Sequence, residues 1–106
     1  MKIKLTMDQY IILSSLYKMY LESIQSGKTS IQSKRFDIYF NQRSPILMNW
    51  PYAEIDKNIV SLKNAKLINV YFDGAFDLTD YAIAFMETRP TNGLELISEF
   101  DSVLNN

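Results

Sequence analysis

The stretch between Leu62 and Thr88 most constrains the fold, because the spacing of its apolar residues changes twice. Helical spacing runs up to Leu62, strict alternation follows through residues 68–78, and helical spacing resumes after Thr79. The pair Asp73-Gly74 interrupts the alternation and is typical of the two positive-φ positions of a type I′ turn. The stretch therefore predicts a helix, a tight β-hairpin and a second helix with almost no connecting chain. The alternating hairpin residues are Ile68, Val70, Phe72, Phe76 and Leu78.

The first helix has a clear start signal. Thr6 is a candidate N-cap, Gln9 three residues later completes a capping box, and Leu5 is placed to pack on Tyr10. Apolar residues then recur at three- and four-residue spacing as far as Gly27, a typical stop. We therefore expect a helix over residues 7–25.

Two further helices are expected before the hairpin. Residues 30–40, with Ser30 as cap, suit a short helix, although the segment FDIYF is also rich in strand formers. Residues 41–51 are typical of a loop, since Pro45 and Pro51 disfavour helix in the residue before each. Pro51 also suits the first turn of a third helix, over about 52–66. Its buried stripe is expected to contain Ile55, Ile59 and Leu62. Its polar side is expected to contain Glu54, Lys57, Asn58, Ser61 and Asn64.

The chain after the hairpin predicts two more helices. Thr79 is expected to cap the fourth, which ends before Pro90. The fifth, over residues 93–104, is the best candidate for a dimer contact, or else it folds back on the first helix to close a monomeric core. Together the elements predict a single domain over residues 1–106. The apolar side of the fifth helix contains Leu96, Ile97, Phe100, Val103 and Leu104.

Composition excludes several kinds of chemistry. The 106 residues include neither cysteine nor histidine, which removes disulfides, thiolate nucleophiles and the commonest general base and zinc ligand. The chain also has no phosphate-binding glycine loop or nucleophile elbow, and no apolar run long enough to span a bilayer. We therefore expect a cytoplasmic, non-enzymatic protein without a cofactor or metal. Its net charge of −1 divides into seven Lys/Arg against three Asp/Glu in residues 1–50 and four against nine in residues 51–106.

The order helix, helix, helix, hairpin, helix is that of the winged helix-turn-helix fold, which is mainly α with a small β-hairpin. The segment LKNAKLI resembles the end of the recognition helix in MarR-, PadR- and ArsR-type regulators, and LTDYAIAFME is similar to their helix after the wing. The resemblance covers residues 62–87. It implies a protein that binds double-stranded DNA and regulates transcription, with the helix over about 52–66 in the major groove and the hairpin as the wing.

The resemblance also implies which residues contact DNA. Residues on the polar side of the third helix would read base edges, because asparagine pairs with adenine and lysine reaches guanine or phosphate. These are Lys57, Asn58, Ser61 and Asn64. Basic residues near the second helix would contact the phosphate backbone. These are Lys34, Arg35 and Arg43. A solvated helix face carries the same residue types, so composition alone leaves an ordinary surface open as well. If the chain forms a twofold dimer, the two recognition helices would read a palindrome at a spacing near one DNA turn, about 34 Å.

Three departures from the family pattern weaken the expectation of DNA binding, and the second of them, the acidic hairpin, motivates an alternative. Lys66 stands where the regulators have glycine, which predicts a lysine in the left-handed conformation. The hairpin region carries Asp73, Asp77 and Asp80, which repel phosphate. The loop before the third helix contains Ile46, Leu47, Met48 and Trp50, which either pack in the core or form an apolar patch. The alternative is a winged-helix interaction module, such as a phage or mobile-element accessory protein. It would bind a protein through Ile46, Leu47 and Trp50 or through the fifth helix.

Overall fold

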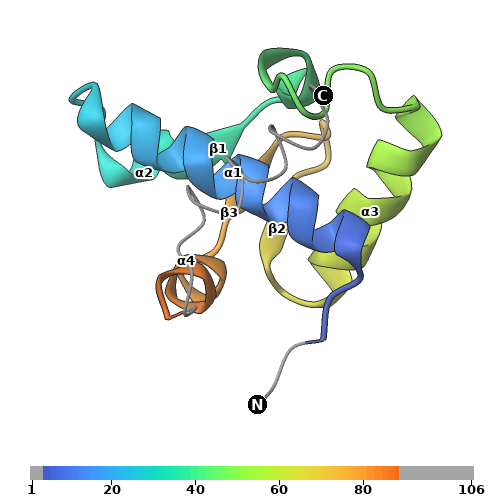
Figure 1. Ribbon diagram of the computed structural model, residues 1–106. Coiled ribbons are helices and arrows are strands. Elements are labelled where there is room, and N and C mark those ends of the chain that lie inside the picture. Colours follow the sequence, from blue (N-terminus) through green and yellow to red (C-terminus); the bar gives the residue numbers. More distant parts are fainter. Residues whose placement is uncertain (1–3, 89–106) are drawn as a thin grey trace, which may run out of the picture.

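The computed structural model describes residues 4–88, which form four α-helices and a small antiparallel sheet of three strands (Figure 1). The helix α1 lies across one face of the sheet, with α3 and α4 flanking it on opposite sides (Figure 1). In chain order the elements are α1 (Met7–Gln25), α2 (Ser30–Lys34), β1 (Arg35–Phe36), the 3₁₀ helix η1 (Phe40–Arg43), α3 (Tyr52–Asn64), β2 (Ile68–Val70), β3 (Phe76–Leu78) and α4 (Asp80–Glu87).

The helix α1 has the expected bounds because its start and its end are both encoded locally. The Thr6 hydroxyl accepts a hydrogen bond from the Gln9 amide at 3.1 Å, and the Gln9 side chain accepts one from the Thr6 amide at 2.7 Å. Gly27 follows the helix with φ at +97°, a conformation that glycine adopts without strain. The capping box predicted for this helix is confirmed.

The second helix is shorter than the sequence predicts. It ends at Lys34, and Arg35 is already extended, with φ −87° and ψ 134°. Residues 35–36 form the strand β1, which pairs antiparallel with β3 so that Phe36 lies opposite Phe76. These two rings stack at a centroid distance of 5.4 Å. The expected helix over residues 30–40 is therefore wrong beyond Lys34, because Phe36 gains more by entering the core than by continuing a local helix.

The segment between β1 and α3 is folded into the core. Its η1 helix places the Phe40 ring edge-on to Phe76 at a centroid distance of 5.1 Å. Ile46 and Leu47, in the turns that follow, are buried. The expectation that this loop packs as part of the core is confirmed for these side chains, and the alternative of an exposed patch is wrong for them.

The helix α3 begins after Pro51, which occupies the N-cap position and not the first turn, and it ends two residues earlier than expected. Its apolar stripe is as predicted, with Ile55 and Leu62 buried and Ile59 packed against the core. Lys66 has φ at +64°, so the predicted left-handed lysine is confirmed. That conformation turns the chain directly from α3 into β2.

The turn of the hairpin differs from the type I′ expectation. The Tyr71 amide donates to the Ala75 carbonyl at 2.8 Å, which leaves three residues, 72–74, in the loop. Gly74 has φ at +90°, whereas Asp73 has no positive φ, so the loop has the pattern of a turn that ends in a left-handed glycine. The Asp73 carboxylate instead accepts a hydrogen bond from the Ala75 amide at 3.1 Å. Phe72 consequently lies in the turn, fully exposed, and not in the strand.

The helix α4 begins as predicted, with the Thr79 hydroxyl accepting from the Ala82 amide at 3.1 Å. The same hydroxyl lies 3.0 Å and 3.1 Å from the carbonyl oxygens of Lys66 and Leu67, to which it donates. Thr79 therefore joins the start of α4 to the base of the hairpin. The fifth helix expected over residues 93–104, with the far end of the single domain, lies outside the described residues. The same applies to the dimer contacts predicted at Leu96, Ile97, Phe100, Val103 and Leu104.

Candidate interaction surface

The four residues predicted to read base edges do not share one surface. Lys57 and Asn64 are exposed on the outer side of α3. Asn58 is only 6% exposed, and its side-chain amide donates to the Glu54 carbonyl at 2.8 Å. Its expected exposure is therefore wrong. At 100° per residue, position 58 lies next to the buried stripe and not opposite it.

Ser61 is also turned toward the molecule. It is half-buried, and its hydroxyl accepts a hydrogen bond from the Gln9 side chain of α1. The bond holds two helices together, so this hydroxyl already has a structural partner. Of the predicted base-reading set, the structure leaves Lys57 and Asn64 available at the surface.

The three basic residues predicted to contact phosphate are all in ion pairs. The pairs are Lys34 with Asp80, Arg35 with Asp77 and Arg43 with Asp37. The Lys34 ammonium lies 2.5 Å from its carboxylate, and the Arg43 guanidinium lies 3.1 Å from its own. A phosphate group would have to compete with these carboxylates, so the charge available for DNA is smaller than the sequence suggests.

The Arg35 pair belongs to a small network on the outer face of the sheet. Asp77 accepts hydrogen bonds from Arg35 and from the Tyr71 hydroxyl, and the Arg35 guanidinium lies 4.6 Å from the Tyr71 ring centroid. Burial raises the pKa of the Asp77 carboxyl, but the hydrogen bonds from Arg35 and Tyr71 outweigh it and the pKa is lowered. The hydrogen bond to Asp77 raises the pKa of Tyr71. These shifts describe a structural network that holds β1 on the sheet.

The apolar loop predicted to bind a protein partner does not form such a surface. Ile46 and Leu47 are buried, and Trp50 is partly buried against the core. Met48 is exposed. Most of the apolar area that this predicted partner surface needs is therefore already used in folding, and only Trp50 of the three residues stays partly exposed.

An apolar groove lies instead between α3 and the hairpin. It has a volume of about 470 Å³, and we call it the α3–hairpin groove. Phe40, Ile55 and Phe76 form its inner part and are buried in the core. Its outer part is open, and the side chains there leave large areas in contact with solvent. The lining residues are Ile38, Phe40, Tyr52, Ile55, Asp56, Ile59, Val60, Val70, Gly74 and Phe76.

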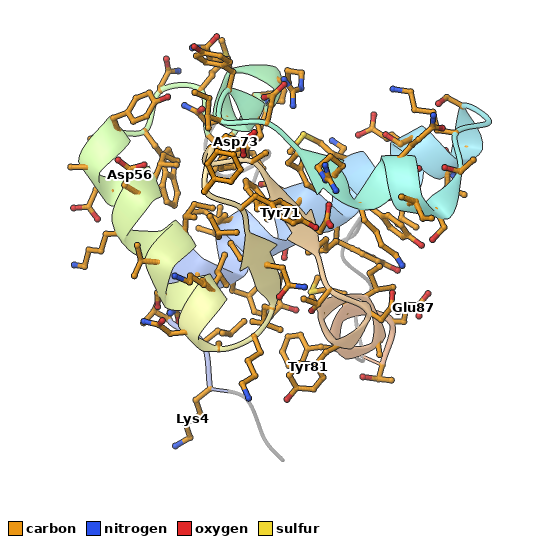
Figure 2. The ribbon with its side chains drawn as sticks, turned by 180° about the vertical axis from the view of Figure 1, so that it is seen from behind. Lys4, Asp56, Tyr71, Asp73, Tyr81 and Glu87 are labelled. Atoms are coloured by element: carbon orange, nitrogen blue, oxygen red, sulfur yellow. The ribbon has the colours of Figure 1, made fainter. Side chains whose placement is uncertain are left out.

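One carboxylate lines the groove, and a second belongs to the chain neighbour of a lining residue. Asp56 lines it from α3, and Asp73 precedes Gly74, which lines it from the hairpin tip. Figure 2 shows Asp56 and Asp73 on these two elements, at the same end of the molecule. Within residues 4–88 neither carboxylate takes part in an ion pair, and no cation of this part of the chain lines the groove. The groove therefore combines an apolar floor with unpaired negative charge.

The sequence contained a signal for this groove. Tyr52, Ile59 and Val60 extend the apolar stripe of α3 to one side, well beyond what the buried Ile55 and Leu62 require. Tyr52 and Val60 are 51% and 55% exposed. A stripe wider than its core contact indicates a second apolar contact.

Other kinds of site find no support in the described part of the chain. Within residues 4–88, no three carboxylates gather closely enough to hold a metal ion. None of the helices there has both the length and the apolarity that crossing a bilayer requires. The chain matches no protein-family model, no curated protein and no solved structure at a significant level. The surface geometry is therefore the basis for the functional proposal.

Proposed function

We propose that this protein is a winged-helix interaction module that binds a partner protein in the α3–hairpin groove. The observation that carries the proposal is the open apolar groove, with Tyr52 and Val60 half-exposed along it and Phe72 fully exposed at the adjoining hairpin tip. Exposed apolar surface gathered in one place is typical of a protein contact site. Partner binding would remove this surface from water.

The winged-helix part of the proposal is supported by the order of the elements. A helix of 13 residues, α3, leads through the left-handed Lys66 into a hairpin, and α4 follows directly. The additional strand β1 extends the hairpin to a sheet of order β1-β3-β2. In a winged helix, α3 corresponds to the recognition helix and β2–β3 to the wing, so the groove lies between the two parts that commonly contact a ligand.

Double-stranded DNA is the second candidate ligand, favoured by one observation. Lys57, Lys63 and Lys66 are exposed on or just after α3, and within residues 4–88 none of them forms an ion pair. They would give α3 a local positive surface. Glu54 and Asp56 on the same helix oppose it, and the paired Lys34, Arg35 and Arg43 add little, so we rank DNA second.

Two matched variants separate the candidates. Val60→Gln places a polar amide in the groove without changing the charge, whereas Lys57→Ala with Lys63→Ala removes two of the three exposed cations and leaves the groove lining intact. The protein ligands are peptides selected from a random display library against the full chain. The DNA ligand is a random pool of labelled duplexes, titrated by fluorescence anisotropy at about 50 and 200 mM salt.

The proposal expects selected peptides whose affinity falls about tenfold or more in Val60→Gln but stays unchanged in the double lysine variant. Duplex affinity should be weak at both salt concentrations. Duplex binding that falls steeply with salt and is lost in the lysine variant, together with an absence of peptides sensitive to Val60→Gln, would overturn the proposal in favour of DNA. Circular dichroism of both variants checks that each is folded.

A further inference from the structure

The shape of the α3–hairpin groove restricts the kind of segment that fits it. The residues of α3 that line it run from Tyr52 to Val60, two turns of helix. The eight steps from Tyr52 to Val60, at a rise of 1.5 Å each, give this wall a length of about 12 Å. The apolar side chains of a second helix at positions i and i+7 are about 10.5 Å apart along its axis. A helix lying alongside α3 would therefore place two anchors within the groove.

The alternative of an added β-strand is opposed by the burial of the sheet edge. The strand β2 is an edge strand. Tyr71 and Leu67 bond to Ala75 and Thr79, the residues on either side of β3, so the main-chain groups of Ile68 and Val70 face outward. Ile68, however, is only 1% exposed, main chain included. Of the two residues of β2 whose main-chain groups face outward, only Val70 is not buried. One residue offers too few hydrogen bonds to add an extended segment to the sheet as a further strand. Apolar side chains must therefore supply the contact.

Negative charge at the groove restricts the charge of the occupant. Asp56 and Asp73 present unpaired carboxylates, so a lysine or arginine beside the apolar anchors would gain an ion pair that DNA or an acidic segment would not. A second copy would bring its exposed Phe72 to the groove only with its own Asp73 beside it. Residues 93–106 of this chain carry Glu95, Glu99 and Asp101 and no cation. Both the hairpin tip of a second copy and residues 93–106 of this chain would therefore bring negative charge to a groove that is already negative.

We infer that the α3–hairpin groove takes an amphipathic helix of another protein, with two large apolar side chains one or two turns apart and a lysine or arginine facing Asp56 and Asp73. The inference rests on the proposed function, since it names the chemistry of the partner that the groove binds. The basic residue fixes the position of the helix in the groove, because Asp56 lies midway along the α3 wall and Asp73 lies next to Gly74 at the hairpin tip.

The sequences of the selected library peptides provide the first test. We expect large apolar residues to recur at three-, four- or seven-residue spacing, with at least one lysine or arginine, and helical circular dichroism to increase on binding. Apolar residues at alternate positions, or selected peptides with acidic flanks, would overturn the inference.

Two protein variants provide the second test. Replacement of Asp56 and Asp73 together by lysine should weaken the selected peptides about tenfold or more, and exchange of the peptide's basic residue for glutamate should restore binding. The control Glu54→Lys changes charge on the other side of α3 and should leave affinity within about twofold. Equal losses in the control and the double variant would overturn the charge assignment.

Two variants of Val70 distinguish helix from strand. Val70→Pro removes the outward-facing main-chain donor of β2 but keeps three side-chain carbons, whereas Val70→Ala keeps the donor and loses two side-chain carbons from the groove lining. A helix in the groove predicts a loss of affinity in Val70→Pro no greater than in Val70→Ala, whereas a strand predicts a clearly greater loss in Val70→Pro. If the peptides lose affinity in Val60→Gln and lose clearly more affinity in Val70→Pro than in Val70→Ala, this inference is overturned and the proposed function stands. A library that yields no peptide sensitive to Val60→Gln would overturn both.

Discussion

Arg35 and Asp77 lie directly opposite each other in the β1–β3 ladder and form an ion pair on the outer face of the sheet. The strand β1 has only two residues, so this pair and the stack of Phe36 on Phe76 are its main side-chain attachments to β3. The Asp77 carboxylate also accepts a hydrogen bond from the hydroxyl of Tyr71, the residue that follows β2. One carboxylate therefore connects all three strands of the sheet.

We predict that acid weakens this connection. Asp77 has a lowered pKa in the folded protein, so its contribution to stability is complete above the ordinary carboxyl pKa of about 3.9 and is lost as pH falls through the lower folded value. Replacement by asparagine should lower the urea midpoint at neutral pH and flatten its decline in acid. Asp56→Asn, at an exposed carboxylate outside any ion pair of residues 4–88, is the control. Equal acid slopes in the wild type and in Asp77→Asn would contradict the assignment.

We predict that Lys66→Gly stabilises the protein. Lys66 has φ at +64°, where a side chain costs about 1–2 kcal/mol, and glycine removes that cost while making the unfolded chain more flexible. The expected net gain is about 0.5–1 kcal/mol in guanidinium denaturation. Lys66→Ala keeps the side-chain penalty and serves as control, so a similar gain there would show that charge and not backbone conformation is responsible.

Gly74→Ala should be destabilising for two separable reasons. Gly74 has φ at +90°, and an added Cβ would lie 2.6 Å from Cγ2 of Ile38. We expect a loss of about 1–3 kcal/mol in unfolding free energy. Ile38→Ala in the same chain should remove the part of this loss that comes from the close contact with Ile38, and should leave the part that comes from the positive φ. A double variant no more stable than Gly74→Ala would mean that the close approach to Ile38 contributes nothing.

The segment between η1 and α3 should behave as core. Leu47 is fully buried, so Leu47→Ala is expected to cost about 2–5 kcal/mol of unfolding free energy. Met48, the next residue, is 55% exposed, and Met48→Ala should change stability by less than about 0.5 kcal/mol. Thermal denaturation of the two variants measures the difference. Similar midpoints would contradict the packing of this segment.

The features that were predicted correctly are those encoded within a few residues. The caps at Thr6 and Thr79 and the left-handed Lys66 depend on neighbours in the chain, and the sequence displays those neighbours directly. The strand β1 was missed because it forms only when Phe36 reaches Phe76, a contact between distant residues. A short helix and a short strand have similar local signals there, and the long-range contact decides.

The errors in the predicted site have a related physical origin. Helical periodicity identified the buried stripe of α3, but it left the side chains at the edges of that stripe undecided. Asn58 falls at one edge and is covered, and Val60 falls at the other and remains open to the groove. The ion pairs of Lys34, Arg35 and Arg43 were likewise invisible, since each cation and its carboxylate meet only through the fold. Counting charges along the chain therefore overestimated the charge left for phosphate.

The bonds of Thr79 have a consequence for the order in which the protein folds. Its hydroxyl reaches the Leu67 carbonyl across only 12 residues of chain, so little loop-closure entropy opposes the contact. The ion pair of Arg35 with Asp77 spans 42 residues and is costlier to close. We therefore expect the hairpin base and the start of α4 to form together early, and β1 to join them late. The groove, which needs Ile38 and Phe40 beside the hairpin, would be completed only in that last step.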